Sequence, residues 1–196
     1  MPSYYSEADI ERLIVQAQRG VPRQGVELRQ RNTAIVMLMA FAGLRRGEVI
    51  GMRAGDIDFN RRVMRVLGKG GRERMVPLVE RLVVALRYLC KDKPSSAPVF
   101  EGLKPKAIHR AITTLARAAG LEGLHAHSLR HAFATRLVER KGNLRAVQML
   151  LGHQSLETTH VYVDVSAQGL FDTIGLLEAQ TGTPVGESAT QPAGPS

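Results

Sequence analysis

The sequence from Leu150 to Asp164 reads LLGHQSLETTHVYVD, and the interpretation of the whole chain starts from it. Its first apolar residues end one helix, and Gly152 follows where a left-handed residue commonly closes a helix. Ser155 is a typical N-cap for a new short helix, near whose end Tyr162 lies, nine residues after His153. A tyrosine on a short, weakly held helix can move into and out of a site. Taken alone, however, the pattern is more typical of a half-buried tyrosine that packs on the preceding helix.

The composition favours one basic domain that binds nucleic acid. The chain has 196 residues, enough for a sizeable core, and a formal net charge of +9. Of its 27 basic residues, 21 are arginine, whose planar fork matches phosphate oxygens, although a merely soluble basic protein shares this composition. Tryptophan is absent and aromatic residues are few, which argues against a base-stacking single-strand binder.

Cysteine content and hydropathy limit which cellular compartments and which kinds of site the sequence suggests. Cys90 is the single cysteine, so the chain has neither an intrachain disulfide nor a cysteine metal cluster. No N-terminal signal peptide is visible, and the longest apolar run, Ala34–Ala42, is too short to span a membrane. We therefore expect a soluble, cytoplasmic protein that needs no cofactor and has no membrane partner.

Hydrophobic periodicity predicts an α+β domain, mainly α, over residues 1–180. Between Asp56 and Leu78 the period changes, with turns at Asn60 and at Gly68–Gly71, which predicts a small three-stranded antiparallel sheet. Residues 181–196 are rich in Gly, Pro, Ser and Thr and are expected to form a disordered tail. Helices are expected after a cap at Ser6, over Arg31–Gly43, from Leu44 through Met52, and over Val79–Cys90, Lys104–Ala119, Ser128–Lys141, Leu144–Leu151 and Ala167–Ala179.

Two basic residues lie beside glycines. Arg45 follows the glycine that ends the buried helix, and Glu48, three residues on, can orient it as an anion clamp, although an exposed ion pair is at least as common. Lys69 lies at a hairpin tip, from which an ammonium can swing onto a ligand, although a solubilising turn lysine is the usual case. The surrounding GKGG lacks the spacing and the Ser/Thr of a P-loop, so it supports an NTPase only weakly.

The segment HAHSLRH from His125 to His131 is the densest cluster of polar side chains. His127 and Arg130 are three residues apart, so one helical turn presents both on one face, where they could bind a phosphate. The histidine spacing matches no standard zinc site, so no metal is expected. His125 and His131 are expected either to be structural or to support the residues that bind a ligand. The chain also lacks an acidic cluster for Mg²⁺, which disfavours a two-metal nuclease.

The candidate site residues share one chemical theme, in which cationic or hydrogen-bonding groups surround a phosphate and a hydroxyl attacks it. They are Arg45, Lys69, His127, Arg130, His153 and Tyr162.

Four segments that contain these residues resemble the catalytic domain of tyrosine recombinases, the family of phage integrases and Xer proteins. The order of the segments and the gap from histidine to tyrosine agree with that family, and the similarity covers roughly Ser6 to Ala179. The segments are AGLRRGE (42–48), GKGGRERMVPL (68–78), HSLRHAFAT (127–135) and LGH (151–153) with Tyr162.

The resemblance implies a helical catalytic domain that cuts and rejoins double-stranded DNA without metal or ATP. Tyr162 would attack a phosphodiester to form a 3′-phosphotyrosine and release a 5′-hydroxyl, whose attack reverses the step. Arg45 and Arg130 would hold the non-bridging oxygens, and Lys69 would protonate the leaving 5′-oxygen.

The resemblance also assigns supporting roles. His127 would assist proton transfer at the nucleophile, His153 would hydrogen-bond the phosphate, and Glu48 would brace the site. Members of the family act as homo-oligomers on DNA, in a tetrameric synapse, and the last helix, Ala167–Ala179, would pack on a neighbouring protomer.

The resemblance begins almost at Met1, whereas family members usually carry a helical DNA-clamping domain of about one hundred residues before the catalytic domain. We therefore expect a chain without that domain, which leaves room for an accessory DNA-binding protein as a partner. A catalytically idle DNA-binding regulator with this fold is the alternative function, and a type IB topoisomerase would share the chemistry. Four arginines are candidates for contacts to the DNA backbone, although a solvated basic face is the default: Arg46, Arg53, Arg72 and Arg74.

Overall fold

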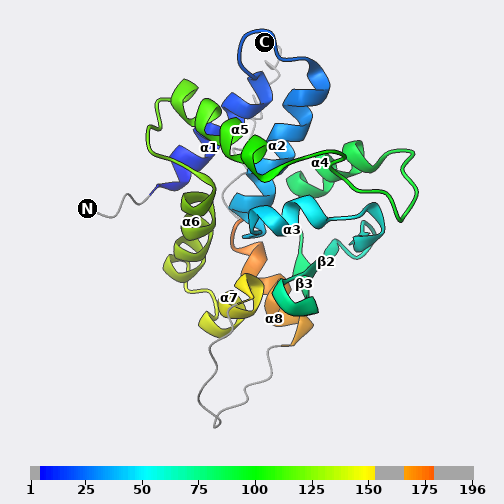
Figure 1. Ribbon diagram of the computed structural model, residues 1–196. Coiled ribbons are helices and arrows are strands. Elements are labelled where there is room, and N and C mark those ends of the chain that lie inside the picture. Colours follow the sequence, from blue (N-terminus) through cyan, green and yellow to red (C-terminus); the bar gives the residue numbers. More distant parts are fainter. Residues whose placement is uncertain (1–4, 153–165, 179–196) are drawn as a thin grey trace, which may run out of the picture.

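The computed structural model describes residues 5–152 and 166–178, and within them the chain is mainly helical with one small sheet, as predicted (Figure 1). The helices are α1 (Glu7–Arg19), α2 (Val26–Phe41), α3 (Arg46–Gly51), α4 (Glu80–Cys90), α5 (Pro105–Ala118), α6 (Ala126–Glu139), α7 (Leu144–Leu151) and α8 (Ala167–Gly175). The strands are β1 (Ile57–Asp58), β2 (Val63–Leu67) and β3 (Glu73–Pro77), and the short 3₁₀ segments are η1 (Ala54–Asp56) and η2 (Lys69–Gly71). In the described part of the chain, no helix is both long and apolar enough to cross a membrane.

Helix α2 is the centre of the core. Every residue from Asn32 to Phe41 is buried, because α1, α3, α4, α5 and α6 all pack against this helix. A helix that is apolar all round has to be covered on every side. The helix begins at Val26, five residues before the predicted start, because its first turn is polar and more exposed and so lacks the apolar signal that the prediction followed.

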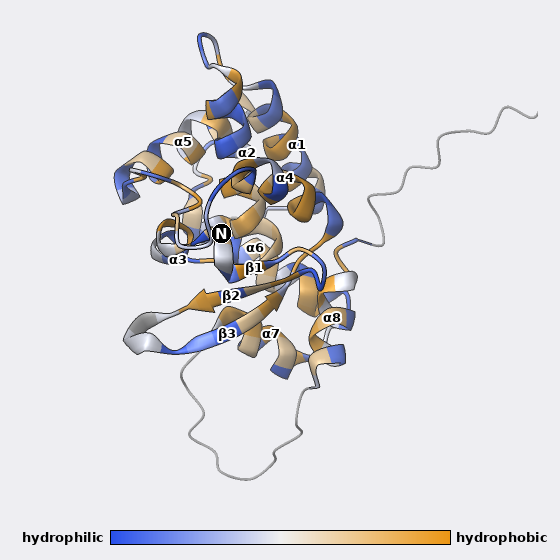
Figure 2. Cartoon of the chain, turned by 90° about the vertical axis from the view of Figure 1, so that its right-hand side faces the viewer, coloured by the Kyte–Doolittle hydropathy of each residue, from blue (hydrophilic) through white to orange (hydrophobic). Residues whose placement is uncertain are grey.

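The three strands form an antiparallel sheet in the order β1-β2-β3. Met64 pairs with both Ile57 and Val76, and these three residues, together with Val66, are buried. Figure 2 shows the strands side by side, with α7 and α8 next to β3. Strand β3 therefore runs from the tip of the β2–β3 hairpin and packs against α7 and α8.

Helices α6 and α8 also differ from their predicted bounds. Helix α6 begins at Ala126 rather than Ser128, because His125 is its N-cap and exchanges capping hydrogen bonds with Ser128. Helix α8 ends at Gly175, four residues before the predicted end, and a turn follows it.

Helix α7 has its predicted bounds, and Gly152 closes it in the predicted left-handed conformation, with φ of 62°. The predicted short helix that carries Tyr162 and the predicted tail over 181–196 lie outside the described residues.

Candidate active site

An open hollow of about 550 Å³ lies where the end of α2, the start of α3, α5 and the start of α6 meet. Arg45, His127 and Arg130 all line it, although Arg45 is far from the other two in the sequence. Three of the six predicted site residues are therefore brought together. The remaining lining residues are Met39, Leu44, Arg46, His109, His125 and Ala126, so among the described residues that line the hollow none is acidic.

Arg130 is the buried cation of this hollow, with only 8% of its surface exposed. Its guanidinium donates hydrogen bonds to the carbonyl oxygens of Gly43 and Leu151. Burial and the nearby charge of Arg45 lower the pKa of Arg130 to about 10. Because this value lies well above neutral pH, Arg130 remains a cation that is held in place by neutral acceptors.

Arg45 is oriented by Glu48, as predicted. Arg45 is the N-cap residue of α3, and its backbone N–H donates to Glu48 Oε2 at 2.8 Å. Its guanidinium reaches Glu48 Oε1 at 3.1 Å and the carbonyl oxygen of Gly152 at 3.5 Å, and the side chain is 47% exposed. Arg45 is thus fixed at one end and accessible to a ligand in the hollow.

Arg74 differs from its prediction as a contact to the DNA backbone. Its side chain is only 12% exposed and binds both carboxylate oxygens of Glu48, at 2.8 and 2.9 Å. Its Nε donates to the carbonyl oxygen of Leu150 at 2.8 Å. The structure does not favour such a contact, because β3 turns this side chain inward, toward α3 and α7, where Glu48 and Leu150 accept its hydrogen bonds.

Glu48 is a buried carboxylate, with 6% of its side chain exposed. Burial alone would raise its pKa, but hydrogen bonds from Arg74 and from the Arg45 backbone, with the charges of both arginines, outweigh burial and lower the pKa. Glu48 therefore stays ionised and binds two arginines from separate elements. The role inferred for it, bracing the site, agrees with these contacts.

The histidines of the cluster separate into two kinds. His125 accepts a hydrogen bond from the Ser128 backbone N–H and caps α6, in agreement with a structural role, and His125 also lines the hollow. His131 lies on an exposed face of α6 beside Thr135. His127 is exposed and lines the hollow, with its ring 6.4 Å from that of His125. Of the two histidines of this cluster that line the hollow, His127 is the one that does not cap α6.

Of the other three predicted site residues, the structure describes only the backbone of Lys69. The backbone of Lys69 begins η2 at the tip of the β2–β3 hairpin, where Gly70 and Gly71 both have φ of 77°. His153 and Tyr162 lie outside the described residues. The last described residue before them, Gly152, accepts the hydrogen bond from Arg45.

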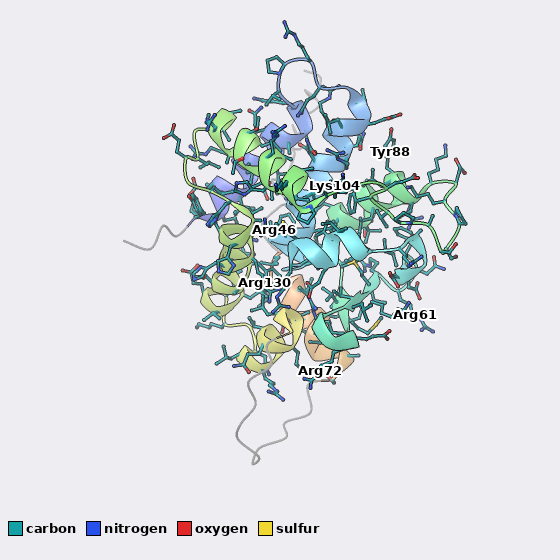
Figure 3. The ribbon with its side chains drawn as sticks, in the orientation of Figure 1. Arg46, Arg61, Arg72, Tyr88, Lys104 and Arg130 are labelled. Carbon is teal, nitrogen blue, oxygen red and sulfur yellow. The ribbon has the colours of Figure 1, made fainter. Side chains whose placement is uncertain are left out.

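Sequence reasoning missed His109, on α5, which lines the same hollow. Arg46 and His109 also line a second hollow of about 910 Å³, which adds Arg31, Lys104, Lys106 and Arg110. Figure 3 shows Lys104, Arg46 and Arg130 following one another on one side of the molecule. The basic residues at the start of α5 were visible in the sequence, but nothing in it placed them beside Arg46.

Metal binding finds no support in the described part of the chain, where no group of three or more His, Cys, Asp or Glu side chains could hold an ion. The donors in the hollow are arginines and histidines, which together suit an anion.

Comparison with known proteins agrees with this arrangement. The family model described as "Phage integrase family" matches residues 4–168. The chain is 39% identical over 152 residues to the tyrosine recombinase XerC of Corynebacterium efficiens, covering 73% of this chain and 49% of that protein. It is also 39% identical over 171 residues to XerC of Methylobacterium nodulans, covering 80% of this chain and 52% of that protein. The chain thus spans about half the length of these relatives.

Solved structures give the same result. The fold is similar to that of the integrase from mycobacterium phage Brujita, with a TM-score of 0.72 and 31% identity, over 90% of this chain and 58% of that one. It is also similar to the XerH site-specific recombinase bound to its difH substrate, with a TM-score of 0.66 and 26% identity, over 81% of this chain and 49% of that one. Since the family model covers most of the chain and includes the hollow, this chain belongs to the phage integrase family.

Proposed function

We propose that this chain is the catalytic part of a site-specific recombinase, which cuts and rejoins double-stranded DNA through a covalent bond to Tyr162. The observation that carries the proposal is the hollow in which Arg45, His127 and Arg130 meet. The hollow lies next to the end of α7, since Arg45 and Arg130 donate to the carbonyl oxygens of Gly152 and Leu151. Tyr162 follows ten residues after Gly152.

The hollow suits a phosphate whose negative charge increases during reaction. Arg45 and Arg130 are held by the protein before a ligand binds, so little reorganisation is needed when they bind non-bridging oxygens. Arg130 is bound by carbonyl oxygens rather than a carboxylate, so its positive charge is retained for the phosphate.

The proposed reaction needs no external energy source. The hydroxyl oxygen of Tyr162 attacks phosphorus, the bond from phosphorus to the 5′-oxygen breaks, and a 3′-phosphotyrosine forms. His127 assists removal of the tyrosine proton, Lys69 gives a proton to the leaving 5′-oxygen, and His153 donates a hydrogen bond to the phosphate. Attack by a 5′-hydroxyl on the phosphotyrosine reverses each step.

Duplex DNA is the proposed partner because the second hollow continues the basic lining of the first. Arg46 and His109 belong to both hollows, and lysines and arginines extend the surface along α5. A row of cations beside a phosphate site can follow a DNA backbone. We propose that two or more copies assemble on DNA, up to a tetrameric synapse, and that an accessory DNA-binding protein contributes to site recognition.

A covalent-trapping assay tests the function. Duplexes with a nick in a random-sequence window are incubated with the chain in EDTA, and covalent protein–DNA adducts are recovered after denaturation. Sequencing of the recovered DNA then supplies a defined nicked substrate. The expected result is an adduct that forms with wild type, is absent with Tyr162→Phe and is unaffected by EDTA.

The remaining outcomes separate the alternatives. Specific DNA binding without an adduct, even when a longer relative is supplied in trans, would favour the regulator. An adduct on a single duplex that only relaxes supercoiled DNA, without exchange between two sites, would favour a topoisomerase.

A further inference from the structure

Arg74 lies at the point where three parts of the proposed site meet. It extends from β3, binds both carboxylate oxygens of Glu48 on α3, and donates to the carbonyl oxygen of Leu150 on α7. These partners are 26 and 76 residues away in the sequence. We refer to this set of contacts as the Arg74–Glu48 bridge.

The bridge also touches the two glycines that directly precede proposed site residues. Gly68 comes before Lys69, and a Cβ added to Gly68 would lie 3.9 Å from Arg74 Nη1 and 4.0 Å from Glu48 Oε1. Gly152 comes before His153, and a Cβ there would lie 3.2 Å from Arg74 Nη1, tighter than most real contacts. The guanidinium is therefore close to the backbone at both positions.

Helix α7 ends on three arginines from separate elements. Its last carbonyl groups have no partner within the helix, and cations are favoured there by the helix dipole. Arg74 binds the carbonyl of Leu150, Arg130 that of Leu151, and Arg45 that of Gly152. Of the three, Arg74 is the one that does not line the hollow, so it is the one whose role is purely to hold others.

We propose that Arg74 is a positioning residue for strand cleavage, which rests on the proposed function. The Arg74–Glu48 bridge holds three segments in one relative position. They are the hairpin that carries Lys69, the start of α3 that carries Arg45, and the end of α7 that precedes His153 and Tyr162. Arg74 itself does not contact DNA, because its guanidinium is taken up by Glu48 and Leu150.

Substitution of Arg74 by lysine separates the effect of its charge from the effect of its fixed hydrogen-bond geometry. Arg74→Lys keeps the positive charge next to Glu48 but cannot hold two carboxylate oxygens and a carbonyl in fixed geometry. The matched control is Arg81→Lys, because Arg81 also binds both oxygens of a glutamate, Glu11, at 2.6 and 3.0 Å, but joins α4 to α1 away from the hollow. Glu48→Asp disturbs the bridge from its other side and serves as a second variant if Arg74→Lys does not fold.

Two measurements decide the proposal, each on protein shown to be folded by near-UV circular dichroism. The first is the single-turnover rate of adduct formation at saturating nicked DNA, together with the Kd for that DNA. The expected result is a rate about 10- to 100-fold lower for Arg74→Lys with Kd unchanged, and a wild-type rate for Arg81→Lys. A merely structural role predicts that both lysine variants lose melting temperature and that neither changes the rate.

The second measurement does not depend on catalysis. Amide hydrogen exchange, followed by mass spectrometry, is compared over residues 68–71 and 144–152. Faster exchange in both segments for Arg74→Lys, but not for Arg81→Lys, is expected. Unchanged exchange there, or a wild-type cleavage rate in Arg74→Lys, overturns the proposal. If wild type forms no adduct, the proposed function fails by that result, and the exchange data still decide whether the bridge positions these segments.

Discussion

Arg62 and Arg65 of the sheet differ from Arg130 of the hollow in what holds them. On the sheet, Arg65 binds Asp56 at 2.7 Å and Glu73 at 2.9 Å, and Arg62 binds Glu80 at 3.1 Å. The side chains of Arg62 and Arg65 are 51% and 50% exposed, and each cation has a carboxylate partner. In the hollow, Arg130 is bound by the carbonyl oxygens of Gly43 and Leu151.

We expect this difference in partners to decide how each arginine is used. A carboxylate holds a guanidinium and also neutralises it, whereas a carbonyl oxygen holds it without removing its charge. The hollow therefore keeps a positive field for an anion, although the sheet has arginines that are more exposed. Four predictions test this comparison, beginning with the largest expected effect.

Replacement of the buried cation should have the largest effect. Arg130→Lys loses the planar fork that binds two carbonyls and that, under the proposed function, binds a phosphate, so we expect the cleavage rate to fall by about 10²- to 10³-fold. Arg65→Lys, on the sheet, should leave the rate unchanged, since its partners are Asp56 and Glu73, which do not line the hollow. Single-turnover trapping on nicked DNA measures both variants. Equal rates for the two would contradict the difference drawn between the regions.

Glycines in the two regions should differ in the free energy of unfolding. Gly43 has φ of 61°, and a Cβ there would lie 2.6 Å from Phe133 Cδ1, so Gly43→Ala should cost about 3 kcal/mol from backbone strain and overpacking. Gly70, at the hairpin tip, has φ of 77° but no atom within 4 Å of an added Cβ, so Gly70→Ala should cost about 1 kcal/mol. Urea denaturation measures both, and a larger loss at Gly70 would refute the packing argument.

Glu48 should make the free energy of unfolding depend on pH in the acidic range. Its pKa is lower in the folded than in the unfolded state, so its contribution is complete above the unfolded value of about 4.3 and is lost as pH falls through the lower folded value. Glu48→Gln should cost about 2 kcal/mol at pH 7, and the difference from wild type should shrink below pH 4. Denaturation of both proteins across this pH range provides the test. A gap that stays constant down to pH 2 would show that ionised Glu48 is not the cause.

The smallest expected effect concerns DNA binding. Arg46 lines both hollows, so Arg46→Ala should weaken binding by less than tenfold and reduce the slope of log Kd against log salt by about 0.9. Arg61, which pairs with Asp58 at 3.8 Å beside the sheet, is the control, and Arg61→Ala should leave the slope unchanged. Fluorescence anisotropy at several salt concentrations distinguishes them. An equal change in slope for both variants would mean that the sheet face also contacts DNA.

Much of the fold was predictable because its signals are local. The cap at Ser6, the all-apolar run of α2, the glycine hairpin and the left-handed Gly152 each follow from a few neighbouring residues. Errors occurred where the signal was weak or shared, as at the polar start of α2 and at the start of α6, where His125 rather than a later residue caps the helix. Local periodicity records which side of a helix is buried, but not where a polar first turn begins.

The sequence by itself determined the order of elements, the family and the pairing of Arg45 with Glu48, because that pair lies within one helical turn. Only the tertiary structure decided that Arg74 turns inward to Glu48 and Leu150, and that His109 reaches the hollow that contains Arg130. An arginine has the same intrinsic preferences wherever it occurs. Its partner is chosen by which acceptors the packing of distant segments leaves within reach of its guanidinium, and that choice is not written in the neighbouring residues.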